Sequence, residues 1–300
     1  MNFLQVLIPI FGVFAIGYLG LKFFKIDIKP ISTMAIYLMS PFLAFQTFYM
    51  NKLNMDYLYL GIYLLVICGV SIAVCYVIAY IKKWDRANTS GFVLATSFMN
   101  SGNYGAPLVL LVFGETGFQY AVILMVLQQL IMCTIGIYIA ARGQVTENAK
   151  VSPLKEVIKV PIVYGAVLGI VFNLFQWNIN EQWMVGINMV ADAAIPTVMI
   201  ILGMQLATIS LKNLEVGKLS VALLIRLAIT PLATYFITLP IPIDEMVKDI
   251  MVLIAAMPTA ANTTMYALQF NAKPSFVSSA TLTSTLLSII TLPLILTFIM

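Results

Sequence analysis

The sequence is divided into apolar runs of about 20 residues, separated by short polar or charged connections. A run of this length spans the ~30 Å hydrocarbon core of a bilayer, because an α-helix rises about 1.5 Å per residue. Charged residues make up only 9% of the chain, against about a quarter in a soluble domain, and the mean hydropathy is +1.00. We therefore predict an all-α integral membrane protein without a soluble domain.

Apolar runs between charged residues or Gly, Pro and Asn breaks predict ten transmembrane helices. The first five cover Phe3–Leu21, Ile31–Met50, Tyr57–Ile81, Ala87–Gly114 and Gly117–Ala141. The second five cover Val157–Phe175, Trp183–Ala207, Leu219–Leu239, Met246–Phe270 and Ser275–Ile299. The first run has no basic segment before it and no small-residue cleavage site, so we expect a retained helix rather than a signal peptide.

The positions of lysine and arginine agree with this count and predict the orientation. Thirteen lie in odd-numbered connections, namely Lys22, Lys25, Lys29, Lys82, Lys83, Arg86, Arg142, Lys150, Lys155, Lys159, Lys212, Lys218 and Lys273. The even-numbered connections contain only Lys52 and Lys248. Since basic loops stay in the cytoplasm, both termini are expected outside the cell membrane. Loop lysines facing anionic lipid headgroups explain the net charge of +4 without a nucleic-acid partner.

Two sets of five helices would run in opposite directions, and matched spacings indicate such an inverted repeat. The matched pairs are Pro9–Gly17 with Pro161–Gly169, each 8 residues apart, and Pro41–Pro107 with Pro196–Asn262, each 66 residues apart. We predict a first repeat over residues 1–146 and a second over residues 147–300. Inverted repeats of this kind are typical of secondary transporters.

The fourth and ninth predicted helices are broken near mid-membrane. The breaks read Asn100-Ser101-Gly102-Asn103-Tyr104-Gly105-Ala106-Pro107 and Pro258-Thr259-Ala260-Ala261-Asn262-Thr263-Thr264. In lipid, the backbone groups freed by such a break must line a polar cavity or pack against protein. Gly102 and Gly105 permit positive φ where the chain crosses over, and Pro107 suits the first turn of a restarting half-helix. We expect Asn262 as the N-cap of the second half of the ninth helix.

Two breaks in corresponding helices can cross at the middle of the bilayer. The half-helices that start there would present N–H groups and positive dipole ends, which attract anions. The candidate substrate-binding residues are Asn100, Ser101, Asn103, Tyr104, Asn262, Thr263 and Thr264, and the helix-breaking residues are Gly102, Gly105, Pro107 and Pro258. Neither break contains a charge, which favours an anion held by neutral donors.

Two charged residues lie inside predicted helices, Asp192 in the seventh and Arg226 in the eighth. Their estimated depths differ by about 6 Å, so a salt bridge between them is geometrically allowed. Asp192 is a candidate for cation coupling or gating, and Arg226 for contact with an anionic substrate. The alternatives are that Arg226 snorkels or that the pair is structural. Gln128 and Gln129 in the fifth helix either face the polar cavity or bridge helices.

The residue inventory opposes enzymatic chemistry. The chain has no histidine, and Cys68, Cys75 and Cys133 lie in apolar runs without a C-x-x-C pattern, so we predict no metal site and no cofactor. An intramembrane aspartyl protease needs two facing aspartates, and a serine protease commonly uses a histidine base. One intramembrane aspartate and no histidine therefore argue against a protease.

The motifs resemble those of the auxin efflux carrier family. Asn100–Pro107 matches its N-x-x-x-x-G-x-P crossover motif. The helix-7 signature is resembled by Asp192-Ala193-Ala194-Ile195-Pro196 followed by Gly203-Met204-Gln205-Leu206, and the helix 9–10 pattern by Met257-Pro258, Asn262 and Ser284-Thr285-Leu286-Leu287-Ser288. The short connection between the fifth and sixth helices is similar to that of prokaryotic members, some of which look like malate or malonate permeases.

The resemblance implies a fold related to sodium/proton antiporters and bile-acid symporters. Scaffold helices 1, 2, 6 and 7 would support a mobile unit of helices 3–5 and 8–10 that moves like an elevator, in a homodimer. The family's substrate-facing asparagine falls on Asn100, and its crossover prolines fall on Pro107 and Pro258.

The expected function is secondary active or facilitative transport of a small organic anion, a carboxylate or dicarboxylate, auxin-like acids included. The alternatives are a sodium- or proton-coupled symporter or antiporter with Asp192 as ion site, and a non-transporting membrane sensor.

Overall fold

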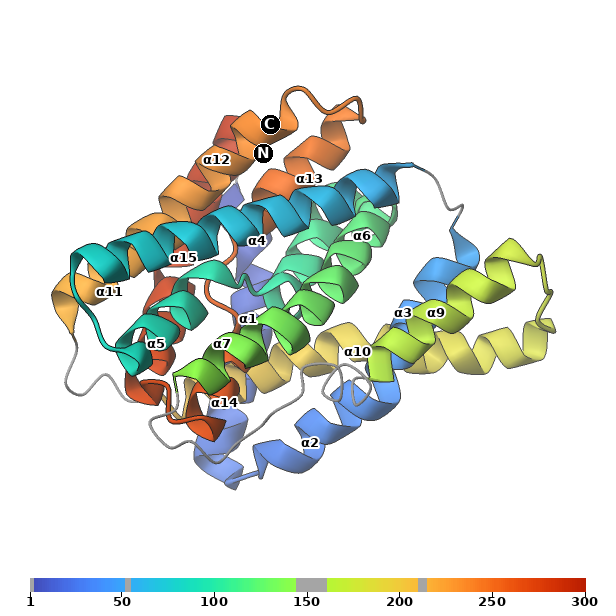
Figure 1. Ribbon diagram of the computed structural model, residues 1–300. Coiled ribbons are helices and arrows are strands. Elements are labelled where there is room, and N and C mark those ends of the chain that lie inside the picture. Colours follow the sequence, from blue (N-terminus) through green and yellow to red (C-terminus); the bar gives the residue numbers. More distant parts are fainter. Residues whose placement is uncertain (1–2, 52–54, 144–160, 210–214) are drawn as a thin grey trace.

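The computed structural model describes residues 3–51, 55–143, 161–209 and 215–300, and their regular elements are all helices (Figure 1). The first part contains α1 (Phe3–Phe24), α2 (Ile28–Met34), η1 (Ala35–Met39), α3 (Ser40–Met50), α4 (Asp56–Ile81), α5 (Arg86–Ser97), η2 (Ser101–Gly105), α6 (Ala106–Ile131), η3 (Met132–Gly136) and α7 (Ile137–Arg142). The second contains α9 (Pro161–Leu174), α10 (Glu181–Leu206), α11 (Val216–Leu224), η4 (Ile225–Ile229), α12 (Thr230–Thr238), α13 (Glu245–Ala255), α14 (Ala261–Gln269) and α15 (Pro274–Ile299). The predicted repeat boundary at 146/147 and the predicted start of the sixth helix at Val157 lie outside the described residues.

The all-α prediction is confirmed over the described ranges, and seven helices there are long and apolar enough to cross a membrane. The prediction of ten spans is not tested by this criterion. The helices α5, α9, α13 and α14 are individually short, and Ser101–Arg142 forms one long helical segment. Within that segment the backbone leaves helical geometry at Gly114 (φ 66°), where the sequence predicts the fourth helix to end.

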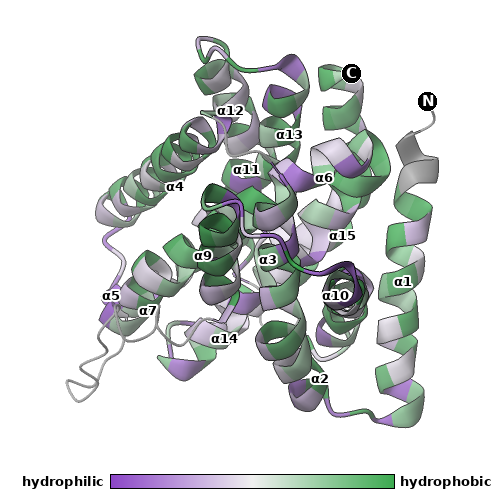
Figure 2. Ribbon diagram, turned by 90° about the vertical axis from the view of Figure 1, so that its right-hand side faces the viewer, coloured by the Kyte–Doolittle hydropathy of each residue, from purple (hydrophilic) through white to green (hydrophobic). Residues whose placement is uncertain are grey.

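The outer faces of the long helices are apolar, as the hydropathy colours of Figure 2 show. On α4, for example, Leu65, Val77 and Ile81 are 56%, 57% and 68% exposed. A soluble monomer rarely exposes a continuous apolar surface of this extent. The exposed surface therefore suits lipid, and the chain is a multi-pass membrane protein.

Glycines allow two helix pairs to approach closely. α1 packs along α10, and a Cβ added at Gly17 would lie 2.0 Å from the Ile200 carbonyl oxygen. α9 packs along α3, and a Cβ added at Gly169 would lie 2.7 Å from the Phe45 carbonyl oxygen. Small residues at such crossings let backbones touch, which is how membrane helices associate without a hydrophobic driving force. Because α10 also packs on α3, these four helices form one connected group.

The remaining long helices pack mainly on one another. α4 contacts α5, α6 and α12, while α13 and α14 contact α15. Both views place the start of α1 and the end of α15 at the same end of the bundle (Figures 1 and 2). The two broken helices, α5–α6 and α13–α14, belong to this second set of helices, and α6 also contacts α1 and α3 of the first set.

We predict that Gly17→Val destabilises the fold by about 1–3 kcal/mol, because the added side chain has no room against the α10 backbone. Gly12→Val on the same helix is the matched control, since a Cβ there meets nothing within 4 Å. Thermal unfolding of the purified variants in detergent measures the difference. Equal losses in the two variants would contradict the close α1–α10 contact.

Candidate functional site

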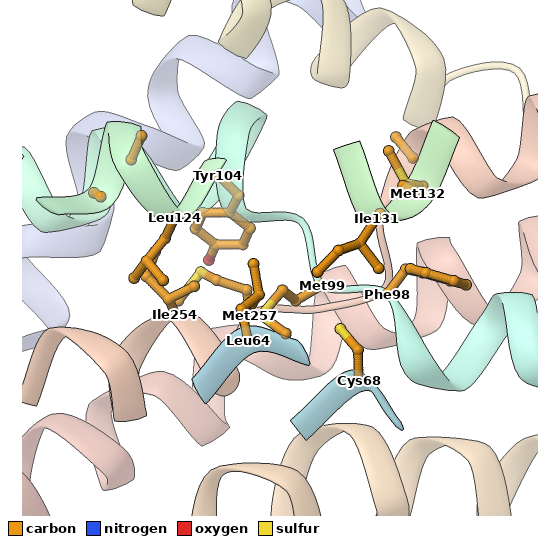
Figure 3. Close-up of a cluster of buried hydrophobic side chains, with 14 of the residues drawn as sticks. Leu64, Cys68, Phe98, Met99, Tyr104, Leu124, Ile131, Met132, Ile254 and Met257 are labelled. Atoms are coloured by element: carbon orange, nitrogen blue, oxygen red, sulfur yellow. The ribbon is translucent and has the colours of Figure 1, made fainter. Parts of the chain in front are cut away.

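The two helix breaks meet, although about 160 residues separate them in the chain. The backbone N–H of Asn100 donates to the Pro258 carbonyl at 2.8 Å, and that of Ala260 donates to the Phe98 carbonyl at 3.0 Å. Met99 and Thr259 thereby form a short antiparallel bridge. In Figure 3, Phe98 and Met99 from the first break and Met257 from the second lie in one buried apolar cluster, beside Leu64 and Cys68 of α4.

The carbonyls at the ends of α5 and α13 receive donors from other helices. The last turn of an α-helix leaves carbonyls without intrahelical partners, and lipid offers no water to replace them. The Thr259 hydroxyl donates to the Ala95 carbonyl at 2.6 Å. The Arg226 guanidinium donates to the Thr96 carbonyl at 3.3 Å and also to the Ala255 carbonyl. One arginine therefore joins the C-terminal ends of both half-helices.

Arg226 is 0% exposed and forms no ion pair with any of the described carboxylates. Its charge is instead set against the C-terminal ends of α5 and α13, which carry partial negative charge from the helix dipole. The allowed salt bridge with Asp192 does not form, and Arg226 does not line the cavity at the crossover. Of the interpretations considered for this residue, the geometry matches a structural one.

The two glycines of the first break do not adopt the positive φ that glycine permits. Among the described glycines only Gly114 has positive φ. The two glycines of the break are needed for space instead: a Cβ at Gly105 would lie 2.7 Å from Ile254 Cδ1, and one at Gly102 would lie 3.1 Å from Met125 Sδ. Pro107 lies in the first turn of α6, as predicted, after a wide turn at Ser101–Gly105.

The second break restarts earlier than predicted. α14 begins at Ala261 with Ala260 as its N-cap, so the assignment of Asn262 as N-cap is wrong by two positions. Ala260 has extended backbone because its N–H pairs with Phe98 across the break. That tertiary hydrogen bond, rather than a local side-chain cap, determines where the helix starts.

A cavity of about 110 Å³ lies against the crossover. Its polar lining residues are Ser32, Ser40, Asn100, Ser101, Asn103, Gln128, Gln129, Gln205 and Asn262, with Gly102 beside them. Met99, Met125, Met132 and several aliphatic side chains form the rest of its described wall. None of the described lining residues carries a charge. The cavity therefore combines amide and hydroxyl groups with an apolar wall.

Four of the residues around this cavity hold a buried polar atom without a partner. The atoms are Ser32 Oγ, Asn100 Nδ2, Gln128 Nε2 and Gln205 Oε1. Leaving such an atom unpaired costs ~1–3 kcal/mol, and most buried polar atoms in folded proteins are paired. Seven such atoms occur in the described residues, and four of them belong to residues that line this one cavity, so the cavity wall offers both donors and acceptors to a polar ligand.

Gln128 faces the cavity and bridges helices at once, so both interpretations of this residue hold. It is 2% exposed, and its Oε1 accepts a weak hydrogen bond from the Cys68 thiol of α4 at 3.7 Å. This contact directs the oxygen away and leaves the NH₂ group unpaired. Gln129 also lines the cavity and donates to Cys133 Sγ at 3.2 Å.

Three predicted site residues lie outside the lining of the cavity. Tyr104 is 0% exposed, packs edge-on against Phe14, and shares a hydrogen bond with the Ser288 hydroxyl at 3.0 Å. The Thr263 hydroxyl donates to the Ala260 carbonyl at 2.7 Å, and Thr264 shares a hydrogen bond with a hydroxyl of α15. All three side chains hydrogen-bond within the protein next to the crossover and do not line the cavity.

Three polar lining residues, Ser32, Ser40 and Gln205, are absent from the predicted site. They come from α2, α3 and α10, outside the broken helices. Gln205 stands in the sequence as a single amide near the end of an apolar run, which is the same weak signal that identified Gln128. A helix-by-helix comparison of buried amides would have found it.

A second cavity, of about 580 Å³, contains Asp192 together with Gln46, Glu115, Gln119 and Pro107. Gln46 Nε2 lies 3.5 Å from Asp192 Oδ1, and the aspartate side chain is exposed. This cavity shares only Leu43 and Ile195 with the first among their described lining residues. Asp192 is therefore separated from the crossover cavity by apolar side chains.

No group of three or more metal-ligating side chains occurs in the described ranges. Asp192 and Glu115 both line the second cavity. Two carboxylates in one open cavity do not by themselves define a metal site.

Comparison with known proteins gives consistent relationships over almost the whole chain. The family model described as membrane transport protein matches residues 3–296. An uncharacterised transporter of Methanothermobacter thermautotrophicus is 25% identical over 270 residues, which is 89% of this chain and 88% of that protein. An uncharacterised transporter of Methanocaldococcus jannaschii is 22% identical over 275 residues, again 89% and 88% of the two chains.

We predict that Arg226→Met destabilises the fold by about 2–4 kcal/mol, because it leaves two buried carbonyls unpaired. Arg226→Lys should lose less, since an ammonium can still reach one of the two carbonyls. Lys29→Met, at an exposed cation, is the control. Thermal unfolding in detergent would check the order of the three variants, and an Arg226→Met as stable as the control would refute the bridging role.

Proposed function

Because the chain belongs to the membrane transport protein family, the auxin efflux carriers that its motifs resemble, we propose that it carries a small organic anion across the membrane. The ligand would bind in the cavity at the crossover. Asn100 and Gln128 would donate amide hydrogen bonds to its carboxylate. Ser101, Asn103 and Asn262 would complete the polar wall.

The observation that carries this proposal is the set of unpaired amide groups around a cavity without charges. A carboxylate has about four lone-pair sites and accepts several hydrogen bonds at once. Asn100 Nδ2 and Gln128 Nε2 are donors without partners in the described structure. The N-terminal ends of the half-helices that restart at Ser101 and Ala261 add positive dipole ends beside them. Neutral donors and dipoles suit an anion that must be released again.

The cavity volume and wall limit the substrate to a small molecule. A cavity of about 110 Å³ has room for several water molecules, far less than the space that a nucleotide or peptide requires. The methionines of its wall adapt to an apolar portion of the ligand, because thioether side chains are flexible and polarisable. A short mono- or dicarboxylate, or a compact aromatic acid, meets both conditions.

We further propose ten crossings arranged as an inverted repeat, with an elevator movement of one helix group against the other. In an inverted repeat, a contact between helices 1 and 7 recurs between helices 6 and 2. The glycine contacts follow this rule. In each pair, one helix has a glycine eight residues after a proline, and this glycine contacts a backbone carbonyl of the other helix that lies four residues after that helix's own proline. The two sets are Pro9, Gly17, Pro196 and Ile200, and Pro161, Gly169, Pro41 and Phe45.

The grouping of helices supports the same proposal. α1, α3, α9 and α10 belong to the predicted scaffold helices 1, 2, 6 and 7, and they pack closely on one another. The crossover and most of the cavity's amides belong to the predicted mobile unit. A homodimer and outside termini in a cell membrane are further expectations of this model.

Asn100→Ala and Gln128→Ala should each weaken binding of the transported carboxylate by about 10-fold or more. A hydrogen bond to a charged group contributes ~1.5–3 kcal/mol, and 1.4 kcal/mol is a factor of ten. The test is uptake and binding of labelled dicarboxylates, monocarboxylates and aromatic acids in proteoliposomes. Gln182→Ala is the amide control, because Gln182 is exposed and lies outside the cavity lining.

Wild-type affinity in both cavity variants would refute the site assignment. Binding without movement of any tested acid across the proteoliposome membrane would instead favour a sensor.

The second candidate function is transport coupled to sodium or protons, with Asp192 as the ion site. This candidate is motivated by the position of Asp192 in a cavity of its own, separate from the crossover cavity. If Asp192 binds the ion, Asp192→Asn should abolish gradient-driven accumulation while carboxylate binding stays unchanged. If it does not, uptake by the variant should respond to sodium and proton gradients as the wild type does. Uptake with and without each gradient separates the two outcomes.

A further inference from the structure

A hollow of about 480 Å³ lies at the end of the bundle opposite the chain termini. It is formed where α4 ends, where α5 begins and where α7 ends. Its described lining residues are Tyr76, Ala79, Tyr80, Lys83, Trp84, Arg86, Thr89, Ser90 and Arg142. Three of these are cations and none is a carboxylate.

The three cations have no counter-ion in the described parts of the chain. Lys83, Arg86 and Arg142 form no ion pair there. Arg142 is held by stacking on the Tyr138 ring, with 5.5 Å between its guanidinium carbon and the ring centroid. Like charges gathered around a hollow repel one another, and a bound anion would relieve that repulsion. A guanidinium group can donate two parallel hydrogen bonds to two oxygens of one phosphate, whereas a lysine ammonium acts as a point charge.

The neighbouring charges are already engaged elsewhere. Asp85 accepts hydrogen bonds from the Asn88 backbone N–H at 2.7 Å and from Asn88 Nδ2 at 3.0 Å. The backbone N–H of Asn88 holds the pKa of Asp85 below its usual value, so this carboxylate stays ionised at the start of α5. Lys218 donates to Asn88 Oδ1 at 2.7 Å and lies over the Trp84 and Phe276 rings. Neither Asp85 nor Lys218 lines the hollow.

The depth of the hollow matches the headgroup region of a bilayer. α4 has 26 residues and is therefore about 39 Å long, which exceeds the ~30 Å hydrocarbon core. Its last turn, with Tyr80, reaches the layer of lipid headgroups, where tyrosines are enriched. Tyr76 and Tyr80 stand one turn apart and are 39% and 86% exposed, and Val77 and Ile81 beside them offer apolar surface for an acyl chain.

We propose that this hollow binds the phosphate group of an anionic phospholipid, with Lys83, Arg86 and Arg142 as the contacting cations. The acyl chains would lie along the exposed face of α4. Basic loops favour the cytoplasmic side, so the lipid would come from the cytoplasmic leaflet. This site is separate from the crossover cavity and does not depend on the transported molecule.

Native mass spectrometry of the purified full chain in detergent tests the proposal, with phosphatidylglycerol and phosphatidylcholine of the same acyl chains as probes. Phosphatidylglycerol should be retained in preference to phosphatidylcholine. Lys83→Gln, Arg86→Gln and Arg142→Gln should each lower its affinity about fivefold, and the triple variant more than tenfold. Lys82→Gln is the matched control, because Lys82 is an exposed neighbour that does not line the hollow.

Lys83→Gly guards against misfolding as an explanation. Lys83 has left-handed backbone (φ 53°), which glycine adopts without strain, so this variant should keep its thermal stability while losing lipid. Unchanged phosphatidylglycerol retention in the triple variant would overturn the site. Inorganic phosphate that displaces the lipid and binds equally well alone would overturn the choice of a lipid as the ligand.

Discussion

The contact of the Arg226 guanidinium with the ends of two half-helices is the interaction on which the centre of this protein depends. A helix that stops inside a membrane leaves carbonyls that must find donors, and two such helices stop here. Arg226 and the Thr259 hydroxyl supply those donors. The backbone N–H groups of Asn100 and Ala260 join the two breaks by hydrogen bonds to carbonyls of the opposite break. The N-terminal ends of the restarting half-helices lie at the cavity, because Ser101 and Ala261 line it.

The charge of Arg226 is therefore kept apart from the cavity in which we propose that the ligand binds. The fixed positive charge lies behind the crossover, where it is buried against backbone, and the cavity itself has only amides, hydroxyls and apolar groups. A charged residue in the cavity would bind an anion tightly and release it slowly. Neutral donors hold it more weakly, and a carrier needs a ligand that leaves on the far side. Asn100 Nδ2 and Gln128 Nε2 are the donors that would contact the proposed anion.

The meeting of the two helix breaks at a polar cavity could be predicted from sequence, but the direction of individual side chains could not. Asparagine, glycine and proline clustered inside apolar runs identified both breaks, and Asn100, Gln128 and Asn262 do line the cavity. Successive helix residues point about 100° apart, so neighbours in a motif face different ways. Tyr104 and Thr263 accordingly pack behind the site. The space requirement at Gly105 and the presence of Ser32 and Ser40 in the cavity lining depend on how other helices pack, and no local pattern encodes them.

The apolar boundary between the two cavities has an electrical consequence. Ser32 and Asn51 mark the far ends of the two cavities along the α2–α3 stretch, roughly 28 Å apart by helical rise, yet both cavities reach Leu43. If the two cavities open to opposite sides of the membrane, the transmembrane voltage would fall mainly across the thin layer between them. For the anion that we propose, the short step past Leu43 and Ile195 would involve most of the electrical work, about 2.3 kcal/mol per charge for each 100 mV. The membrane potential would thus act on transport at these two side chains.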